Sequence, residues 1–341
     1  MIKGPSITVA GAGAFGLASA LRLAEAGARV RVFDPLQDQP NASGVAAGML
    51  APGFEVALDP SVRAHLDLLM AGRNLWPELE RRLGLVIDRS GAAAIGGADF
   101  LHRAAMGLKS AGLHAGDLPA RAIQTLAPGL APGFSQAVFT REDWRIDAAA
   151  ALVALRQAAE AAGVEFLPVE ALGFEGADWL VIATGAAQDL AVLAPALGQL
   201  SPIKGQILRL TRPYRGITLR AEGGYVVPDA GGTAVGATMQ PGRRDLEIDP
   251  ETLAPLHTLA SALFPGEAVG EVRVQTGIRA ATPDGLPMVG RDRHPNVILA
   301  TGARRNGWLL APLVARIVVA CITEGDAGPY ATRLDPRRFA T

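Results

Sequence analysis

The sequence predicts an α/β protein in which a discontinuous Rossmann-like domain is combined with a second α+β domain containing an antiparallel sheet. The first observation is a complete βαβ unit over residues 7–34, with two short apolar strands flanking an amphipathic helix. The second is that short apolar strands at 179–184 and 296–301 each run into a glycine. The third is that residues 207–219 and 225–237 alternate like antiparallel strands.

A glycine-rich turn joins the first strand to its helix and has the spacing G-x-G-x-x-G, Gly11-Ala12-Gly13-Ala14-Phe15-Gly16. Gly11 allows a tight turn, Gly13 admits a pyrophosphate against the backbone, and Gly16 lets the helix pack on the strand. The unpaired N–H groups at the helix start hold phosphate. Asp34 ends the second strand and can accept from ribose hydroxyls, which favours FAD or NAD over NADP. The unit therefore predicts a dinucleotide site.

Bulk composition is that of a globular protein, with 341 residues, 49% apolar, 19% charged and a net charge of -1. This charge gives no reason to expect nucleic acid as a partner. The longest apolar stretch, 309–322, is interrupted by Arg316 and is too short to span a bilayer. The lone Cys321 cannot form an internal disulfide, and no signal peptide is recognisable at the start. We expect a cytoplasmic protein without membrane association.

Periodicity and turn residues divide the rest of the chain. Helices are expected over 60–83, 100–112, 147–162, 253–264 and from 309 onward, a strand over 164–169, and an irregular proline-rich segment over 113–143. Antiparallel segments interrupt the parallel pattern twice. We therefore predict one domain from residues 1–84, 144–205 and 275–341, and a second from 85–143 and 206–274.

Three strand ends are expected to meet at one edge of the parallel sheet, because ligands in open α/β sheets bind at the carboxyl ends of strands. They are Val9-Ala10-Gly11, Ala183-Thr184-Gly185 and Ala300-Thr301-Gly302. Two strand–glycine ends beyond the first suit a long ligand such as FAD better than NAD.

These residues, with several longer strings, resemble the D-amino-acid oxidase superfamily of flavoproteins, and within it the glycine oxidases of thiamine biosynthesis. The most specific strings are Ala46-Ala47-Gly48-Met49-Leu50-Ala51-Pro52 and Arg305-Asn306-Gly307-Trp308-Leu309-Leu310-Ala311-Pro312. Further matches are Lys204-Gly205-Gln206, Gly224-Tyr225-Val226-Val227-Pro228, Val235-Gly236-Ala237-Thr238 and the segment 279–287. The resemblance covers nearly the whole length.

The resemblance implies non-covalent FAD and oxidation of a small amino acid or amine to the imine, with molecular oxygen giving hydrogen peroxide. It implies catalytic roles for Tyr225, Arg279 and Arg305. Residues expected to bind FAD are Gly11, Ala12, Gly13, Ala14, Phe15, Gly16, Asp34, Ser43, Ala46, Ala47, Gly48, Met49, Leu50, Val169, Thr184, Gly185, Gly302, Arg305, Asn306, Gly307, Trp308 and Leu309.

The chemistry of these side chains agrees with that expectation, although each has a plainer alternative. Arg279 follows an apolar run and could grip a carboxylate with two N–H groups, or form an inter-domain salt bridge. Tyr225 could donate to the same carboxylate or simply pack. Arg305 could line the substrate or pair with an acid. The five histidines are dispersed without metal-ligand spacing, so no metal is expected.

Two departures from the family pattern are visible. Ala303 stands where relatives often have histidine after the last strand, and the segment between Val169 and Trp179 is short. Three other functions stay open: a D-amino-acid dehydrogenase with an acceptor other than oxygen, a non-catalytic flavin-binding module, and an NAD-dependent dehydrogenase. The sequence leaves homo-oligomer formation open.

Overall fold

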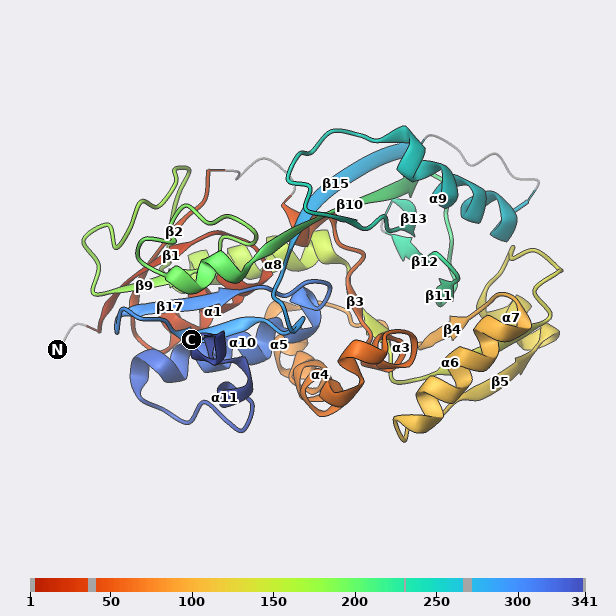
Figure 1. The fold of residues 1–341 in the computed structure, drawn as a ribbon, viewed down its shortest axis with the longest axis horizontal. Coiled ribbons are helices and arrows are strands. Elements are labelled where there is room, and N and C mark those ends of the chain that lie inside the picture. The colour runs from red at the N-terminus through yellow and green to blue at the C-terminus, as the bar shows by residue number, and fades with distance from the viewer. Residues whose placement is uncertain (1–3, 36–40, 230, 266–271, 340–341) are drawn as a thin grey trace.

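The computed structural model describes residues 4–35, 41–229, 231–265 and 272–339 (Figure 1). Its first layer is a six-stranded sheet in the order β16-β17-β9-β1-β2-β8. The strands are β1 (Ser6–Ala10), β2 (Arg29–Phe33), β8 (Glu165–Leu167), β9 (Trp179–Ile182), β16 (Met288–Arg291) and β17 (Val297–Thr301). All neighbours are parallel except β16 and β17. The predicted βαβ unit therefore forms the centre of this sheet.

Helices cover one face of this sheet and an irregular segment covers the other. The helices are α1 (Ala14–Glu25), α8 (Ala148–Ala161) and α10 (Gly307–Thr323), with α4 (Leu66–Asn74) and α5 (Trp76–Leu83) packed outside them. Val9, Leu21 and Val314 are fully buried in the cluster between them. On the opposite face, Ile182 packs against Leu197 of the 3-10 helix η2 (Pro195–Gln199). Burial on both faces explains why β9 and β17 are almost continuously apolar.

The second layer is a larger sheet in the order β14-β10-β13-β12-β11-β4-β6-β5, with β15 paired along β10. Its strands are β4 (Ala92–Ala94), β5 (Gly116–Pro119), β6 (Gln136–Thr140), β10 (Ser201–Leu210), β11 (Thr218–Ala221), β12 (Gly224–Asp229), β13 (Gly232–Gly236), β14 (Gln240–Pro241) and β15 (Val272–Ala281). Only β4 and β11 are parallel neighbours. Helices α6 (Ala98–Ser110), α7 (Ala120–Leu126) and α9 (Pro250–Leu263) pack against it.

Short elements lie where the two sheets approach each other. They are α2 (Ala42–Val45), β3 (Met49–Leu50), α3 (Pro52–Leu58), η1 (Pro60–His65) and β7 (Trp144–Arg145), with α11 (Ala331–Leu334) and η3 (Pro336–Phe339) near the end of the chain. Figure 1 shows the long strands β10 and β15 running side by side from the first layer into the second. No helix among the described residues combines the length and apolar character needed to cross a membrane.

Several sequence expectations hold locally and two are wrong. Asp147 caps α8, because its carboxylate accepts from the N–H of Ala150 at 2.9 Å. The single helix expected over 60–83 is divided into η1, α4 and α5, and Pro77, which lacks an N–H, stands in the first turn of α5. The segment 113–143 was expected to be irregular but contains β5, α7 and β6. Those strands are short, and distant partners stabilise them.

The predicted domain ranges can be compared with the strands of the two sheets. All strands of the six-stranded sheet lie in the ranges predicted for the first domain, and β4, β5, β6 and β11–β14 lie in those predicted for the second. However, β10 and β15 each cross a predicted boundary, at 205/206 and 274/275. The division into domains stays a prediction.

Candidate functional site

The glycine-rich turn has the geometry that its spacing predicts. Gly11 has φ of +99°, in the region that favours glycine. A β-carbon on Gly16 would overlap the carbonyl oxygen of Gly11, so only glycine lets α1 lie this close to the end of β1. Asp34 is 8% exposed and accepts from the N–H of Ala12 at 2.6 Å. The turn is thus held by the acid that the sequence assigned to the second strand.

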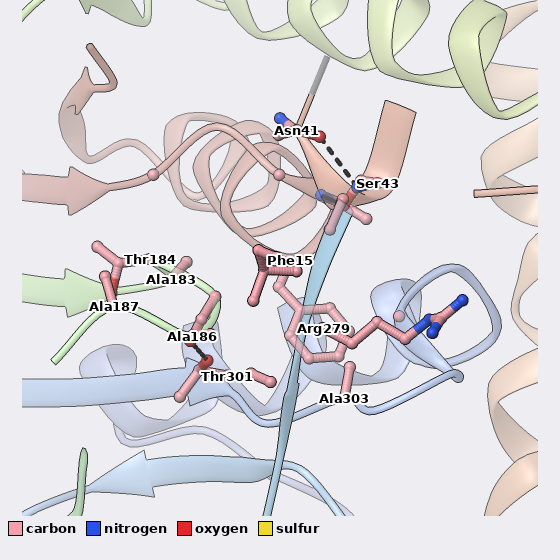
Figure 2. Close-up of a pocket in the computed structure, with 18 of the residues that line it drawn as sticks. Phe15, Asn41, Ser43, Ala183, Thr184, Ala186, Ala187, Arg279, Thr301 and Ala303 are labelled. Atoms are coloured by element: carbon pink, nitrogen blue, oxygen red, sulfur yellow. Dashed lines mark hydrogen bonds between the residues drawn. The ribbon is translucent and has the colours of Figure 1, made fainter. Parts of the chain in front are cut away.

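The three predicted strand ends do converge. The N–H of Ala183 donates to the carbonyl of Ala10 at 2.8 Å, and the hydroxyl of Thr301 donates to the carbonyl of Gly185 at 2.6 Å. All three ends line a cavity of about 520 Å³ that also reaches Arg279 on β15. In Figure 2, Thr184 and Ala187 lie at one end of this group of residues and Arg279 at the other, with Phe15 between them. The lining therefore reaches from the ends of the sheet strands to Arg279.

Asn41 and Ser43 build the wall facing the glycine-rich turn (Figure 2). The side chain of Asn41 accepts from the N–H groups of Ser43 and Gly44, both at 3.0 Å, and so caps α2. The Ser43 hydroxyl accepts from the N–H of Ala14 at 3.0 Å, which ties α2 to the start of α1. Asn41 is a site residue that the sequence analysis missed, although an asparagine before Ala-Ser-Gly is a recognisable capping signal.

Arg279 lies where β15 passes the cavity, half-buried, with its guanidinium above Gly205 of β10. Its Nη1 donates to the carbonyl of Thr238 at 3.2 Å and contacts the sulfur of Met239 at 3.3 Å. Within the described part of the chain, no carboxylate lies within ion-pair distance of it. Burial lowers the pKa of the Arg279 guanidinium, and the neighbouring positive charges of Arg305 and Arg304 act in the same direction. The position is therefore ready to accept an anion.

Tyr225 and Arg279 each influence the pKa of the other side chain. It lies on β12 directly opposite Gly236, and its phenol occupies the space that a β-carbon there would need. Burial raises the pKa of the phenol, although the guanidiniums of Arg279, Arg209 and Arg220 partly oppose that rise. Tyr225 therefore stays protonated near neutral pH and can donate a hydrogen bond.

Arg305 pairs with acids, which is the plainer of its two alternatives, and it also lines the cavity, so a position beside the substrate stays a prediction. Its guanidinium lies 2.7 Å from Glu55 of α3 and also pairs with Asp59, which Arg304 contacts at 3.0 Å. Burial lowers the pKa of Arg305, but the two carboxylates outweigh burial and raise it. Arg304 has φ of +49°, a left-handed conformation that costs energy outside glycine. The ion pairs fix the loop after β17 against α3.

The structure places most, but not all, of the predicted cofactor residues on the cavity wall. Those that line it are Gly11, Ala12, Gly13, Ala14, Phe15, Asp34, Ser43, Ala46, Thr184, Gly185, Gly302, Arg305, Gly307 and Trp308. Those outside its lining are Gly16, Ala47, Gly48, Met49, Leu50, Val169, Asn306 and Leu309, together with Tyr225. Their roles stay predictions.

Packing explains the positions of several residues in the second group. A β-carbon on Gly48 would overlap the carbonyl of Ile146, so glycine at this position lets the backbone pack closely against another part of the chain. Met49 and Ala47 pack against the same small buried cluster as Tyr225, while Leu309 is 1% exposed inside the core beside the cavity. The wall near Val169 is instead made by Glu170 and Ala171.

Other lining residues come from the second sheet and its loops, and had no local sequence signal. Arg244 and Leu246 belong to the loop between β14 and α9. Arg244 crosses to the first layer and donates to the carbonyl of Ala186 at 2.8 Å. In the same loop, Asp245 pairs with the fully buried Lys204 of β10. These contacts hold the loop against the cavity.

Comparison with known proteins now decides the family. The family model described as FAD dependent oxidoreductase matches residues 6–321. The chain belongs to this family of FAD-dependent oxidoreductases.

Individual relatives are similar over nearly the whole chain. A bifunctional ThiO/ThiG protein of Trichormus variabilis is 31% identical over 98% of this chain, which spans 55% of that relative's length. The chain thus spans about half the length of this fused relative. A putative thiamine biosynthesis oxidoreductase ThiO of Rhizobium etli is 34% identical, over 91% of this chain and 94% of the relative. The crystal structure of glycine oxidase from Geobacillus kaustophilus has a TM-score of 0.81 and 25% identity, and the match covers 99% of this chain and 100% of the other.

The residues that line the cavity fit FAD, the cofactor of this family. The turn and helix start that are predicted to hold phosphate line one part of it. The hydroxyl of Thr276 on β15 is buried at the cavity wall and has no hydrogen-bond partner among the described residues. A buried hydroxyl without a partner is costly, which indicates that a ligand supplies one. We therefore assign this cavity to FAD.

Proposed function

We propose that this oxidoreductase uses FAD and molecular oxygen to convert glycine or another small amino acid or amine to the corresponding imine, with formation of hydrogen peroxide. The observation that carries this proposal is the position of Arg279, a half-buried guanidinium at the cavity that has no carboxylate partner in the described part of the chain. A planar guanidinium can bind a carboxylate through two parallel hydrogen bonds. We infer that the carboxylate of an amino acid supplies the missing anion.

Tyr225 and the Arg305 loop complete the proposed substrate site. The protonated phenol of Tyr225 can donate to the same carboxylate, because the strand register places Tyr225 and Arg279 on the same face of the large sheet. Arg305 is held by Glu55 and Asp59, so we assign it to shaping the site rather than to gripping the substrate. Holding the carboxylate at a fixed place orients the amine and its α-carbon, which is the contribution expected of the protein in a cofactor-dependent reaction.

The reaction requires no acid–base pair from the protein if the amine enters in its neutral form. FAD held in the cavity would supply the acceptor for the α-hydrogen and two electrons of the substrate, and molecular oxygen would be the final oxidant, giving hydrogen peroxide. The backbone N–H groups at the start of α10, near Gly307 and Trp308 on the cavity wall, can stabilise negative charge there. We also propose that FAD is not covalently bound, since no cysteine or histidine is among the described residues lining the cavity.

A role in thiamine biosynthesis belongs to the same proposal. It is supported by the names of the relatives that match this chain over most of its length. The bifunctional relative extends well beyond the region of similarity, so the activity of its remaining part is not proposed for this chain.

The test is anaerobic titration of the purified protein with glycine, sarcosine and D-alanine while the flavin absorbance is recorded. Loss of absorbance, followed by peroxide formation when oxygen is admitted, is the expected result. Bleaching with no peroxide would indicate a dehydrogenase with another acceptor. Bound flavin that no amine bleaches would contradict the proposal and indicate a non-catalytic flavin-binding module. Protein purified without flavin would reopen the NAD-dependent alternative.

A further inference from the structure

A second arginine, Arg220, lies beside Tyr225 on the same face of the large sheet. Arg220 on β11 is directly opposite Tyr225 on β12, which is directly opposite Gly236 on β13. Gly236 pairs with Ile207 on β10, and Ile207 pairs with Gln275, four residues before Arg279 on β15. Directly paired residues share a face, and side chains along a strand return to it at every second residue. Arg220, Tyr225 and Arg279 therefore point to one side.

Arg220 and Arg279 differ from the neighbouring arginines in their partners. Arg209 pairs with Asp229, and Arg304 and Arg305 pair with acids at the cavity. The guanidinium of the half-buried Arg220 contacts the sulfur of Met49 at 3.4 Å, and within the described part of the chain no carboxylate lies within ion-pair distance. A thioether is a weak acceptor. The charge of Arg220 is therefore left without a strong partner.

One acid, Asp143, lies close enough for its ionisation to be influenced by Arg220. Its two oxygens accept from the N–H groups of Gly53 and Phe54, at 2.6 and 3.0 Å, so they cap the start of α3. Asp143 consequently gives Arg220 a favourable field but no direct ion pair. A purely structural role for Arg220 would rest on this field and on the weak contact with Met49.

The two guanidiniums, neither of which has a carboxylate partner among the described residues, are spaced for a small ligand. Arg279 reaches over Gly205 on β10, and β11, which carries Arg220, is three strand positions away in the sheet. Three steps correspond to roughly 14 Å between backbones, and both side chains extend above the sheet. This span is of the order that a short diacid occupies when it is gripped at both ends. Tyr225, between the two, can donate to either acid group.

We propose that the preferred substrate is an amine that carries two acid groups, and that Arg220 determines this preference by binding the acid group distant from Arg279. This inference rests on the proposed function, because Arg279 is taken to hold the carboxylate next to the reacting carbon. Arg220 acts in substrate selection and in no bond-making or bond-breaking step.

Matched substrate pairs test the proposal directly. Aspartate and alanine, each as both enantiomers, differ by one carboxylate, and so do iminodiacetate and sarcosine. We expect kcat/KM to be about tenfold or more higher for the diacid of a pair, as expected for one additional charge-assisted contact. In Arg220→Met this ratio should fall to about one, and in Arg220→Lys, which keeps the charge but loses the planar fork, it should lie between the two values.

Binding without turnover provides an independent readout. Malonate and acetate are titrated into the oxidised holoenzyme, and the change in the flavin spectrum gives their dissociation constants. Malonate should bind more tightly than acetate to the wild type, but equally to Arg220→Met. The matched control is Arg316→Met. This substitution removes an exposed arginine of α10 that pairs with Asp326, and it should keep the preference for malonate.

The outcomes separate this inference from the proposed function. If monoacid amines bleach the flavin but the wild type shows no preference for diacids, or Arg220→Met retains one, the inference is wrong and the proposed function stands. If Arg220 only offsets Asp143, its replacement will alter thermal stability without changing the diacid-to-monoacid ratio, which also overturns it. If Arg220→Met does not fold, the Arg220→Lys ratio and the wild-type preference still decide. If no amine bleaches the flavin and no carboxylate perturbs it, the proposed function fails.

Discussion

The guanidinium of Arg279 occupies the space above Gly205 where a β-carbon would stand. The two residues lie on neighbouring strands, and Gly205 pairs directly with Gly277 rather than with Arg279. The side chain of Arg279 therefore lies along the sheet and packs over Gly205, which has no side chain to obstruct it. This contact explains why the middle residue of the Lys-Gly-Gln string, which is part of the family resemblance, is Gly205.

Replacing Gly205 with alanine should displace the Arg279 guanidinium without disrupting the fold, because the obstructing atoms are the end of a flexible side chain. We expect KM for amino acids and the dissociation constant of acetate to rise by about tenfold or more, the size of a lost charge-assisted contact. Gly198→Ala is the matched control, since a β-carbon there meets no atom within 4 Å. Unaltered acetate affinity in Gly205→Ala would contradict the role assigned to this contact.

Two glycines of the phosphate-binding turn should respond differently to alanine. A β-carbon on Gly16 overlaps backbone of Gly11, which cannot move aside, so Gly16→Ala should destabilise the protein by about 1–3 kcal/mol and abolish flavin retention. At Gly13 the nearest atom is the Ser43 hydroxyl at 3.2 Å, so that substitution should lower flavin occupancy with less loss of stability. The ratio of flavin to protein absorbance and thermal unfolding of both variants provide the check. Equal stability losses would be inconsistent with this packing.

Thr276→Val should separate cofactor binding from protein stability. The hydroxyl has no partner among the described residues, so its removal should leave the apoprotein as stable as the wild type or more stable by about 1 kcal/mol. If FAD supplies the missing partner, the dissociation constant for FAD should rise by up to about tenfold, which corresponds to about 1.4 kcal/mol. Titration of apoprotein with FAD measures the latter. An apoprotein destabilised by the substitution would show that the hydroxyl is already paired.

Asp143 should make stability depend on pH. Burial raises the pKa of this carboxyl to about 6, although hydrogen bonds from Phe54 and Gly53 and the charge of Arg220 partly oppose the rise. Between pH 3.8, its ordinary pKa, and about 6, the folded protein binds more protons than the unfolded chain. The free energy of unfolding therefore loses up to about 3 kcal/mol from this group as pH rises through that window.

Asp143→Asn removes this titration. The free energy of unfolding of the wild type minus that of Asp143→Asn should fall as pH rises from about 4 to about 6, and then level off. Denaturant unfolding across that range, at saturating FAD, gives the difference, and the other acids cancel because both proteins contain them. A difference that rises with pH would show that the folded protein favours the charged carboxylate.

Local signals predicted a large part of this fold. The turn from Gly11 to Gly16, the cap at Asp147 and the apolar run of α10 depend on contacts a few residues apart, so the spacing of residue types was enough. The parallel strands were recognisable because they are buried on both faces. In contrast, β6 is stabilised by pairing with β4, which lies in an earlier segment, and β5 by pairing with β6, and no local pattern marks either strand.

By itself the sequence determined the nucleotide-binding turn, the acid that holds it, and the family, because these depend on residue identity at fixed short spacings. Only the tertiary structure decided the surroundings of the site. Contacts between segments tens to hundreds of residues apart place Gly205 beneath Arg279 and pair Arg305 with its acids. They also leave the hydroxyl of Thr276 without a partner among the described residues. The register of whole strands sets those contacts, and a shift of one residue in a strand reverses the face on which every side chain lies.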